Sequence, residues 1–297
     1  MQRIGKPRIL IVGCGDVGMR LLPLLVNLLP LLVKKYRVFA LTSSSSRMSA
    51  LRQAGAIPVY GNLDQPETLW RLPHLAAQVI HLAPPATQGL QDRRTSNLLS
   101  ILSHGAGFIR QLIYISTTGV YGDCQGALID ETQTLNPSTA RAQRRVSAEQ
   151  QIRAWGMSGV QTHILRVPGI YAGDRLPIER LGRGTPVLNA DEDVYTNHVN
   201  ADDLARLITY VLWRGKSQRV INACDDSQLK MADYFDLIAE KMNLPKPPRA
   251  SRQDLSAQLD PMMLSFMGES RRIQNKRLKE LRFKLRYPTV EDCLDSL

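Results

Sequence analysis

Three glycines with the spacing Gly13-x-Gly15-x-x-Gly18 follow a short apolar run and open a segment with helical periodicity. In this arrangement the first glycine permits a tight turn, the second lets backbone N–H groups approach a pyrophosphate, and the third lets the helix pack on the strand. The start of the helix, at Asp16 and Val17, then faces the phosphates. The spacing therefore predicts a dinucleotide site in this loop.

The end of the second predicted strand indicates which dinucleotide binds. An acidic residue there would bind the ribose 2′-hydroxyl of NAD, but the sequence runs Thr42-Ser-Ser-Ser-Ser-Arg47. Hydroxyl groups such as that of Ser43, together with the Arg47 guanidinium, suit a 2′-phosphate. We therefore expect NADP rather than NAD. The alternative is a polar turn with an ordinary arginine at the start of a helix.

A third set of residues that could take part in chemistry lies on a helix predicted over residues 136–155. Arg141, Arg145 and Glu149 recur every four residues, so they share one face of this helix. Taken alone, such a face is usually solvated and carries an Arg145/Glu149 ion pair worth ~0.3–0.5 kcal/mol. The surrounding sequence changes that interpretation below.

Strands and helices alternate along the first half of the chain and must position these groups. The apolar runs are continuous rather than alternating, which indicates parallel strands covered by helices on both faces. We expect an α/β fold with a Rossmann-type doubly wound parallel sheet, whose ligands lie at the carboxyl ends of the strands. The predicted strands are 8–12, 37–42, 57–60, 78–83, 111–116 and 160–167.

A change of texture after residue 167 predicts a second domain. Glycine- and proline-rich loops precede a further helix at 202–213 and a strand at 219–223. We expect a dinucleotide-binding Rossmann domain formed by 1–167 and 195–223. A smaller interleaved substrate or lid domain is expected from 168–194 and 224–297.

Composition places the chain among soluble globular proteins, with 43% hydrophobic and 22% charged residues in 297. The most apolar stretch, 21–33, is shorter than the roughly 20 residues of a membrane span, and its Pro23 and Pro30 predict a broken, buried helix. The four cysteines are scattered, so we expect neither a metal site nor disulfides. With no export signal apparent, a cytoplasmic protein without a membrane partner is expected.

The formal net charge of +11 favours anionic partners. Between 246 and 286 there are eleven Lys or Arg against four Asp or Glu, so the C-terminal quarter is the expected basic end. Ile273, Leu278 and Leu281 nevertheless fit a helix packed with its charges outward. We therefore expect a small anionic substrate and disfavour nucleic acid.

Together these motifs make the chain resemble the extended short-chain dehydrogenase/reductases, the NAD-dependent epimerase/dehydratase superfamily. The resemblance covers nearly the whole chain and implies a possible homodimer. Besides the glycine loop, the matching segments are "VIHLAPP" (79–85), "YISTTGVYGD" (114–123), "RRVSAEQQI" (144–152), "LRVPGIYAGDR" (165–175), "HVNADDLARLI" (198–208), "INACDD" (221–226) and "SRRIQNKRLKELRFKLRYPT" (270–289).

This resemblance implies roles for individual residues. Thr117 occupies the place of the catalytic Ser/Thr that hydrogen-bonds a substrate oxygen. Thr118 and Gly119 stand where dehydratases of the superfamily carry Asp-Glu, so sugar dehydration is disfavoured. The implied cofactor contacts outside the glycine loop and Ser43/Arg47 are Asn62 and Leu63 near the adenine, Ala83 and Pro84 after the fourth strand, and Pro168 and Tyr171 beside the nicotinamide.

The catalytic Tyr-x-x-x-Lys of this superfamily is replaced by Arg141 and Arg145. An arginine stays protonated because its pKa exceeds ~12, so Arg141 cannot act as the phenol does. Arg145 can still hold ribose hydroxyls and place positive charge near the nicotinamide, and Arg141 either binds a substrate anion or faces solvent. Candidate replacements for the acid/base are Tyr121, Tyr171 and His198, which the sequence does not rank.

Two functions follow as expectations. The first is an NADP-dependent oxidoreductase or epimerase that acts by hydride transfer on a sugar-nucleotide-like or other anionic carbonyl/alcohol substrate. The second is a catalytically degenerate protein that binds NADP(H) as a regulator or sensor. The retained Thr117 and "GIYAGDR" loop favour the first, and the missing Tyr/Lys pair favours the second.

Overall fold

The computed structural model describes residues 6–26, 36–105, 107–258 and 261–297, and its contacts divide the chain into two units. The sheet unit consists of Met1–Thr117, Ala140–Arg166 and Leu204–Ile221, and the second unit of Thr118–Thr139, Val167–Asp203 and Asn222–Leu297. The sequence-based division assigns 118–139 and 195–203 to the sheet domain. In the structure both segments belong with the second unit.

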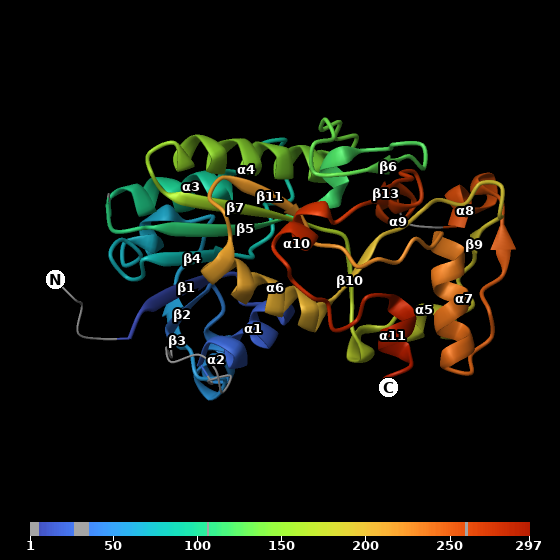
Figure 1. Ribbon diagram of the computed structural model, residues 1–297, viewed down its shortest axis with the longest axis horizontal. Coiled ribbons are helices and arrows are strands. Elements are labelled where there is room, and N and C mark those ends of the chain that lie inside the picture. Colours follow the sequence, from blue (N-terminus) through green and yellow to red (C-terminus); the bar gives the residue numbers. More distant parts are fainter. Residues whose placement is uncertain (1–5, 27–35, 106, 259–260) are drawn as a thin grey trace. The chain divides into compact units, whose positions relative to one another are not determined.

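A seven-stranded parallel sheet in the order β11-β7-β5-β4-β1-β2-β3 forms the centre of the sheet unit (Figure 1). The chain direction across the sheet reverses between β1 and β4, which is where ligands bind in doubly wound folds. The strands are β1 (Arg8–Val12), β2 (Arg37–Thr42), β3 (Ile57–Tyr60), β4 (Gln78–His81), β5 (Gln111–Thr117), β7 (Gln161–Val167) and β11 (Arg219–Asn222).

Helices cover both faces of this sheet, as the continuous apolar strands predict. Figure 1 shows α3 and α4 on one face and α1 and α6 on the other. All side chains of β1 from Ile9 to Val12 are 0% exposed. The helices are α1 (Asp16–Val26), α2 (Met48–Gln53), α3 (Arg93–Ser103), α4 (Ala140–Gly156) and α6 (Ala201–Arg214).

Pro23 does not break the first helix. It lies inside α1 with its ring exposed, while Leu21, Leu22 and Leu25 are buried. The helix continues to Val26, so the expected break at Pro23 is wrong. Residues 27–35, which include Pro30, lie outside the described residues. Among the described residues, no helix combines the length and apolarity that crossing a membrane requires.

The second unit is built from short elements around its own core, which includes Tyr171, Phe235, Ile238 and Val290. Its helices are α5 (Ile178–Gly182), α7 (Met231–Lys241), α8 (Arg252–Gln258), α9 (Pro261–Phe266), α10 (Lys276–Glu280) and α11 (Val290–Leu294). Its strands are β6 (Leu128–Ile129), β8 (Gly169–Tyr171), β9 (Val187–Leu188), β10 (His198–Asn200), β12 (Arg249–Ala250) and β13 (Arg272–Ile273).

The basic C-terminal segment does not form the expected single helix. Ile273 lies in β13, which pairs in parallel with β6, and only Lys276–Glu280 is helical. Ile273 and Leu278 are buried, but from a strand and a helix rather than from one helix face. The spacing of these apolar residues fits a helix, but Ile273 lies in a strand that pairs with β6, which is far away in the sequence.

Candidate functional site

The glycine loop follows β1, which lies next to β4 at the point where the order of the strands reverses. Gly13 follows β1 with φ +83°, and a Cβ there would lie 2.5 Å from the backbone of Ala83, which follows β4. A Cβ on Gly15, by contrast, would meet no atom within 4 Å. The loop therefore packs tightly on its protein side and leaves space above Gly15, as a pyrophosphate at the start of α1 requires.

The other loop residues lie at the start of α1. A Cβ on Gly18 would come within 2.9 Å of the Cys14 sulfur, so the third glycine permits close packing. Asp16 is exposed at the first position of α1 and pairs with Arg20 at 3.2 Å. Val17 is half-buried. These residues fit a dinucleotide whose phosphates contact the backbone rather than a cationic side chain.

Arg47 lies near the glycine loop across the carboxyl end of β2. Burial raises the pKa of the Cys14 thiol to about 11, and the positive charge of Arg47 acts in the opposite direction. Both Ser43 and Arg47 are exposed, while Ser44 and Ser46 share a hydrogen bond of 2.7 Å between their hydroxyls. The exposed guanidinium and hydroxyls fit a phosphate on the adenosine ribose.

Residues after β3 and β4 are fixed by hydrogen bonds within the sheet unit. Asn62 accepts a hydrogen bond from the Asp64 backbone at its Oδ1, and the Leu63 carbonyl accepts one from Asn97. Ala83 is 7% exposed and donates from its N–H to the Val12 carbonyl. The loop ends expected to contact the adenine and the nicotinamide half are therefore ordered.

One guanidinium ties these two loops together. Arg94 donates to both carboxylate oxygens of Asp64, at 2.8 and 2.6 Å, and to the Pro84 carbonyl at 3.1 Å. The pKa of Asp64 is lowered, chiefly by its hydrogen bond from Arg94. Arg94 is not among the residues predicted from sequence, because its partner lies 30 residues away and no local spacing links them.

Arg145 binds the strand that carries Thr117. Its Nη1 donates to the Tyr114 hydroxyl at 2.9 Å and to the Ile115 carbonyl at 2.8 Å. Burial raises the pKa of Tyr114 to about 12 although the Arg145 charge opposes this. Tyr114 is 0% exposed, so its hydroxyl anchors Arg145 and does not reach a substrate. Thr117 is half-buried at the end of β5.

Glu149 does not pair with Arg145, so the expected ion pair on this helix face is wrong. Both oxygens of Glu149 accept from Arg166 on β7, at 3.1 and 2.7 Å, and Oε1 also accepts from the Ser116 hydroxyl at 2.7 Å. The Arg166 and Glu149 side chains are 3% and 1% exposed. A buried carboxylate prefers a bidentate guanidinium with further hydrogen bonds over a solvated neighbour one turn away.

The two bonded groups on α4 thus hold consecutive residues of β5. Arg145 holds Ile115 and Glu149 holds Ser116, and Thr117 follows directly. Arg166 stands inside the apolar run "HILRV", and a buried charge requires a partner. This position could therefore have predicted a buried ion pair from the sequence. Arg141 lies in the first turn of α4 and is half-buried.

The three candidate replacements for the acid/base all lie in the second unit and are buried. Tyr121 donates to Asn222 at 2.7 Å, and Tyr171 donates to the Thr289 carbonyl at 3.2 Å. Burial raises the pKa of Tyr171 and lowers that of His198 to about 3. These groups are 1%, 1% and 5% exposed, which suits structural roles.

Burial is the main cause of the raised pKa of Tyr171, and the nearby negative charge of Asp225 adds to it. The His198 ring stacks on Tyr234 with centroids 4.0 Å apart. Asp225 is 3% exposed, and burial raises the pKa of its carboxyl to about 8. Its Oδ1 accepts from the Ser227 backbone at 3.0 Å. Pro168, expected beside the nicotinamide with Tyr171, is half-buried.

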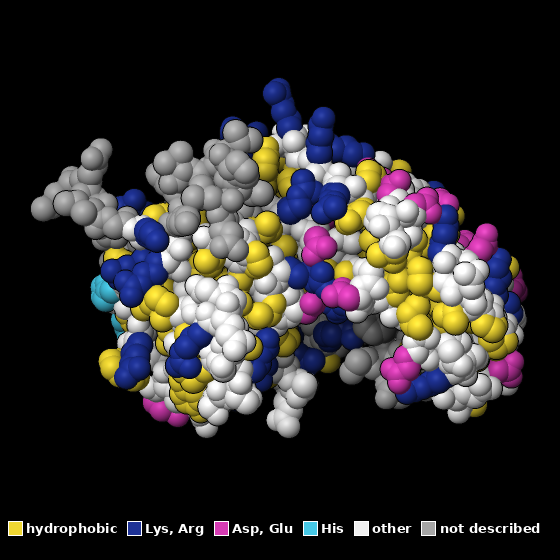
Figure 2. Space-filling view, turned by 90° about the horizontal axis from the view of Figure 1, so that it is seen from below, with side chains coloured by type: hydrophobic (Ala, Val, Ile, Leu, Met, Phe, Trp, Pro, Cys, Tyr) yellow, Lys and Arg dark blue, Asp and Glu magenta, His cyan; other side chains and the backbone are white. Residues whose placement is uncertain are grey.

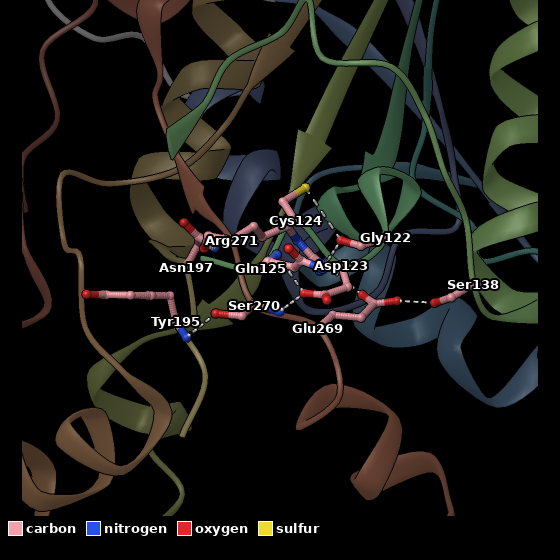
Figure 3. Close-up of polar contacts among 10 residues, drawn as sticks. All are labelled: Gly122, Asp123, Cys124, Gln125, Ser138, Tyr195, Asn197, Glu269, Ser270 and Arg271. Atoms are coloured by element: carbon pink, nitrogen blue, oxygen red, sulfur yellow. Dashed lines mark hydrogen bonds and ion pairs between the residues drawn. The ribbon is translucent and has the colours of Figure 1, made fainter. Parts of the chain in front are cut away.

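The segment between Thr117 and α4 is held by the C-terminal part of the second unit (Figure 3). Asp123 accepts from the backbone N–H of Ser270 at 2.8 Å, and Arg271 donates to the Gly122 carbonyl at 2.6 Å and to Glu269 at 2.7 Å. Glu269 accepts from the Ser138 hydroxyl at 2.5 Å. The entry to α4 is therefore fixed through Glu269 and Arg271.

Comparisons with known proteins agree with this geometry. The NAD dependent epimerase/dehydratase family matches residues 9–224. Protein YeeZ of Escherichia coli K12 is 28% identical over 181 residues, which are 61% of this chain and 60% of YeeZ. The chain thus spans about three fifths of the length of this curated relative.

Solved structures resemble the chain over almost its whole length. A functionally unknown conserved protein from Silicibacter pomeroyi has a TM-score of 0.82 with 28% identity, covering 98% of each chain. The UDP-glucose 4-epimerase of Thermotoga maritima, solved with UDP-glucose, has a TM-score of 0.77 with 18% identity, covering 97% of this chain and 96% of the epimerase. The second likeness concerns the fold alone.

Proposed function

Because the chain belongs to the NAD-dependent epimerase/dehydratase family, we propose that it is an NADP(H)-dependent oxidoreductase acting on an anionic carbonyl/alcohol substrate. The observation that carries this proposal is the glycine loop, closed against Ala83 at Gly13 and open above Gly15. The likeness to an epimerase solved with UDP-glucose supports a sugar-nucleotide-like substrate.

The bound cofactor would supply or accept a hydride at the nicotinamide. In this proposal the loop that Gly13 and Gly18 shape receives the pyrophosphate at Gly15, and Ser43 and Arg47 receive the 2′-phosphate. The half-buried Thr117 hydroxyl orients a substrate oxygen. The fixed charge of Arg145 stabilises negative charge that develops on that oxygen.

A second candidate function is an NADP(H)-binding regulator or sensor without turnover. It is favoured by the burial of Tyr121, Tyr171 and His198, which leaves each engaged within the second unit. Loss of a general acid or base costs ~10²–10⁴ in rate, so hydride transfer without one would be slow. Both candidates share the same cofactor site and differ in chemistry.

Paired titrations with NADPH and NADH, followed by nicotinamide fluorescence, test the shared part. We expect tighter binding of NADPH. Arg47→Asp should weaken NADPH by about 10–100-fold, the value of one charge-assisted hydrogen bond, and NADH far less. Arg52→Asp is the matched control, because Arg52 is exposed on α2 and makes the same change of charge. Equal loss of both cofactors in Arg47→Asp would refute the NADP assignment.

The double variant Arg141→Tyr/Arg145→Lys separates the two candidates. Turnover of sugar nucleotides or anionic alcohols by the natural chain, lost in the double variant, would support the oxidoreductase. Alcohol oxidation gained only in the variant would show that the natural site is degenerate and favour the sensor. Absence of binding to either cofactor would refute both.

A further inference from the structure

Charge is distributed unevenly between the two units. Counted over the sequence, the sheet unit has 22 Lys or Arg against 5 Asp or Glu, which leaves a formal net charge of +17. The second unit has 16 against 22, which leaves −6. In Figure 2, Lys and Arg are spread over the sheet unit, whereas Asp and Glu gather mainly on the second unit. The excess positive charge of the protein thus belongs to the sheet unit.

The C-terminal quarter is therefore not the basic end that the sequence suggests. Its basic side chains lie among acidic side chains of the same unit, and many are paired with them. These ion pairs are Lys276–Asp130 at 2.6 Å, Arg249–Asp236 at 2.7 Å, Arg271–Glu269 at 2.7 Å, Lys246–Glu240 at 3.4 Å and Lys279–Asp226 at 3.4 Å. These ion pairs neutralise basic side chains between 246 and 286, so the positive field expected from this segment is largely removed.

The acidic residues of the sheet unit all lie away from the amino-terminal ends of its strands. Asp16, Asp64, Glu67 and Asp92 follow the carboxyl ends of β1, β3, β3 and β4, and Glu149 is buried inside α4. Asp64 and Glu149 are already paired with arginines, as described above. The amino-terminal edge of the sheet consequently has no acidic side chain among the described residues.

Exposed cations occupy that edge. Arg8 begins β1 and lies directly opposite Arg37, which begins the neighbouring β2. Arg110 precedes β5, and Arg214 and Lys216 precede β11. All five are exposed, and no ion pair within the described residues involves any of them. We call these five residues the amino-terminal patch.

The dimensions of the amino-terminal patch follow from the sheet. Five strand spacings separate β2 from β11, which is about 24 Å at ~4.8 Å per strand. Two further exposed arginines, Arg52 and Arg153, lie in the last turns of α2 and α4, which return toward the same edge. Helix dipoles account for arginines at helix ends, but not for two arginines opposite each other at strand starts.

An aromatic pair lies beside the cations. Trp213, the neighbour of Arg214, is 38% exposed, and its indole Nε1 donates to the Tyr36 hydroxyl at 2.6 Å. Tyr36 in turn precedes Arg37. A held, partly exposed indole next to a row of cations provides a surface on which a base can stack.

We propose that the amino-terminal patch binds the sugar-phosphate backbone of a single-stranded nucleic acid, a partner that the sequence disfavoured on the basis of the C-terminal segment alone. A row of unpaired cations suits a linear polyanion better than a compact one, and the indole suits a base. Strand direction puts this patch at the edge opposite the glycine loop. Nucleic acid and dinucleotide would therefore bind at separate sites, and the inference does not depend on the proposed function.

The test is fluorescence anisotropy of a labelled oligonucleotide of about 20 nucleotides, longer than the usual 4–16 of one binding module. With five phosphate contacts, affinity should fall about 100-fold between about 50 and about 200 mM KCl. Arg37→Gln/Arg110→Gln should bind at least ~10-fold more weakly and lower the salt slope by about 1.4. The independent variant Arg214→Gln/Lys216→Gln should act in the same way.

The matched control is Arg93→Gln/Arg282→Gln, which removes two exposed arginines elsewhere. It should keep its affinity, and thermal melting should show that all variants fold. Equal loss in the control would mean that only net charge matters, which would overturn the proposal. So would displacement of the oligonucleotide by saturating NADPH, because that would place it in the glycine loop. Binding of phosphatidylserine vesicles without oligonucleotide binding would equally refute it.

Discussion

The buried Glu149–Arg166 pair makes a sharp prediction about stability. Glu149→Gln keeps the shape of the side chain but takes the Glu149 carboxylate charge away from the Arg166 guanidinium, which is 3% exposed. Removing one partner of a buried ion pair typically costs about 3–5 kcal/mol, because the remaining charge stays desolvated. For a unit of this size that corresponds to a fall in Tm of about 6–20 °C.

Thermal and urea unfolding followed by circular dichroism measure this loss. Glu67→Gln is the control, since Glu67 is an exposed carboxylate of the same unit and should change stability by less than about 0.5 kcal/mol. Replacing all three residues, with Glu149→Leu, Arg166→Met and Ser116→Ala, should recover most of the loss, because both buried charges and the hydroxyl bonded to them are removed together.

Two results would refute this reasoning. A cost below about 1 kcal/mol for Glu149→Gln would mean that the pair is not effectively desolvated. A triple variant as unstable as the single one would mean that packing, and not an unpaired charge, sets the loss. The predicted pattern requires a large single effect together with recovery in the triple variant.

Three further predictions concern other sites. Asp225→Asn should stabilise the protein by up to a few kcal/mol at about pH 9 and hardly at all at about pH 4. The folded-state pKa of Asp225, about 8, exceeds the ordinary 3.8, so between these values the native carboxyl holds a proton that the unfolded chain has lost, and stability falls as pH rises. Measurements of Tm against pH check this, and an effect that does not depend on pH would contradict it. Gly13→Ala should abolish dinucleotide binding and lower Tm, because its Cβ would lie 2.5 Å from the Ala83 backbone; titration and melting measure both, and unchanged binding would contradict the loop geometry. Arg145→Met should cost about 1–3 kcal/mol even without cofactor, through its two lost hydrogen bonds to β5, and an unchanged Tm would show that those bonds contribute nothing.

The fold was predictable because its signals are local. The first three strands have the bounds expected from their apolar runs, and the helix expected over 136–155 is α4. The glycine spacing likewise fixes the loop that lies between β1 and α1. Such features depend on neighbouring residues, whose periodicity and turn chemistry the sequence displays directly.

The missed features depend on partners far apart in the chain. The i,i+4 rule pairs Glu149 with Arg145, but a buried carboxylate takes Arg166 from the next strand. Ile273 fits a helix by spacing and is a strand by its pairing with Ile129. The assignment of 118–139 to the second unit has the same origin, since many of its hydrogen-bond partners lie at 269–277.

The pairing of β6 with β13 has a consequence for biosynthesis. Leu128 and Ile129 emerge from the ribosome long before Arg272 and Ile273, an interval of roughly 7–30 s at usual translation rates. The sheet, in contrast, has all seven strands once Asn222 has been made. The nascent chain can therefore complete its glycine loop while the connection from β5 to α4 still awaits its partner, and the second unit folds last.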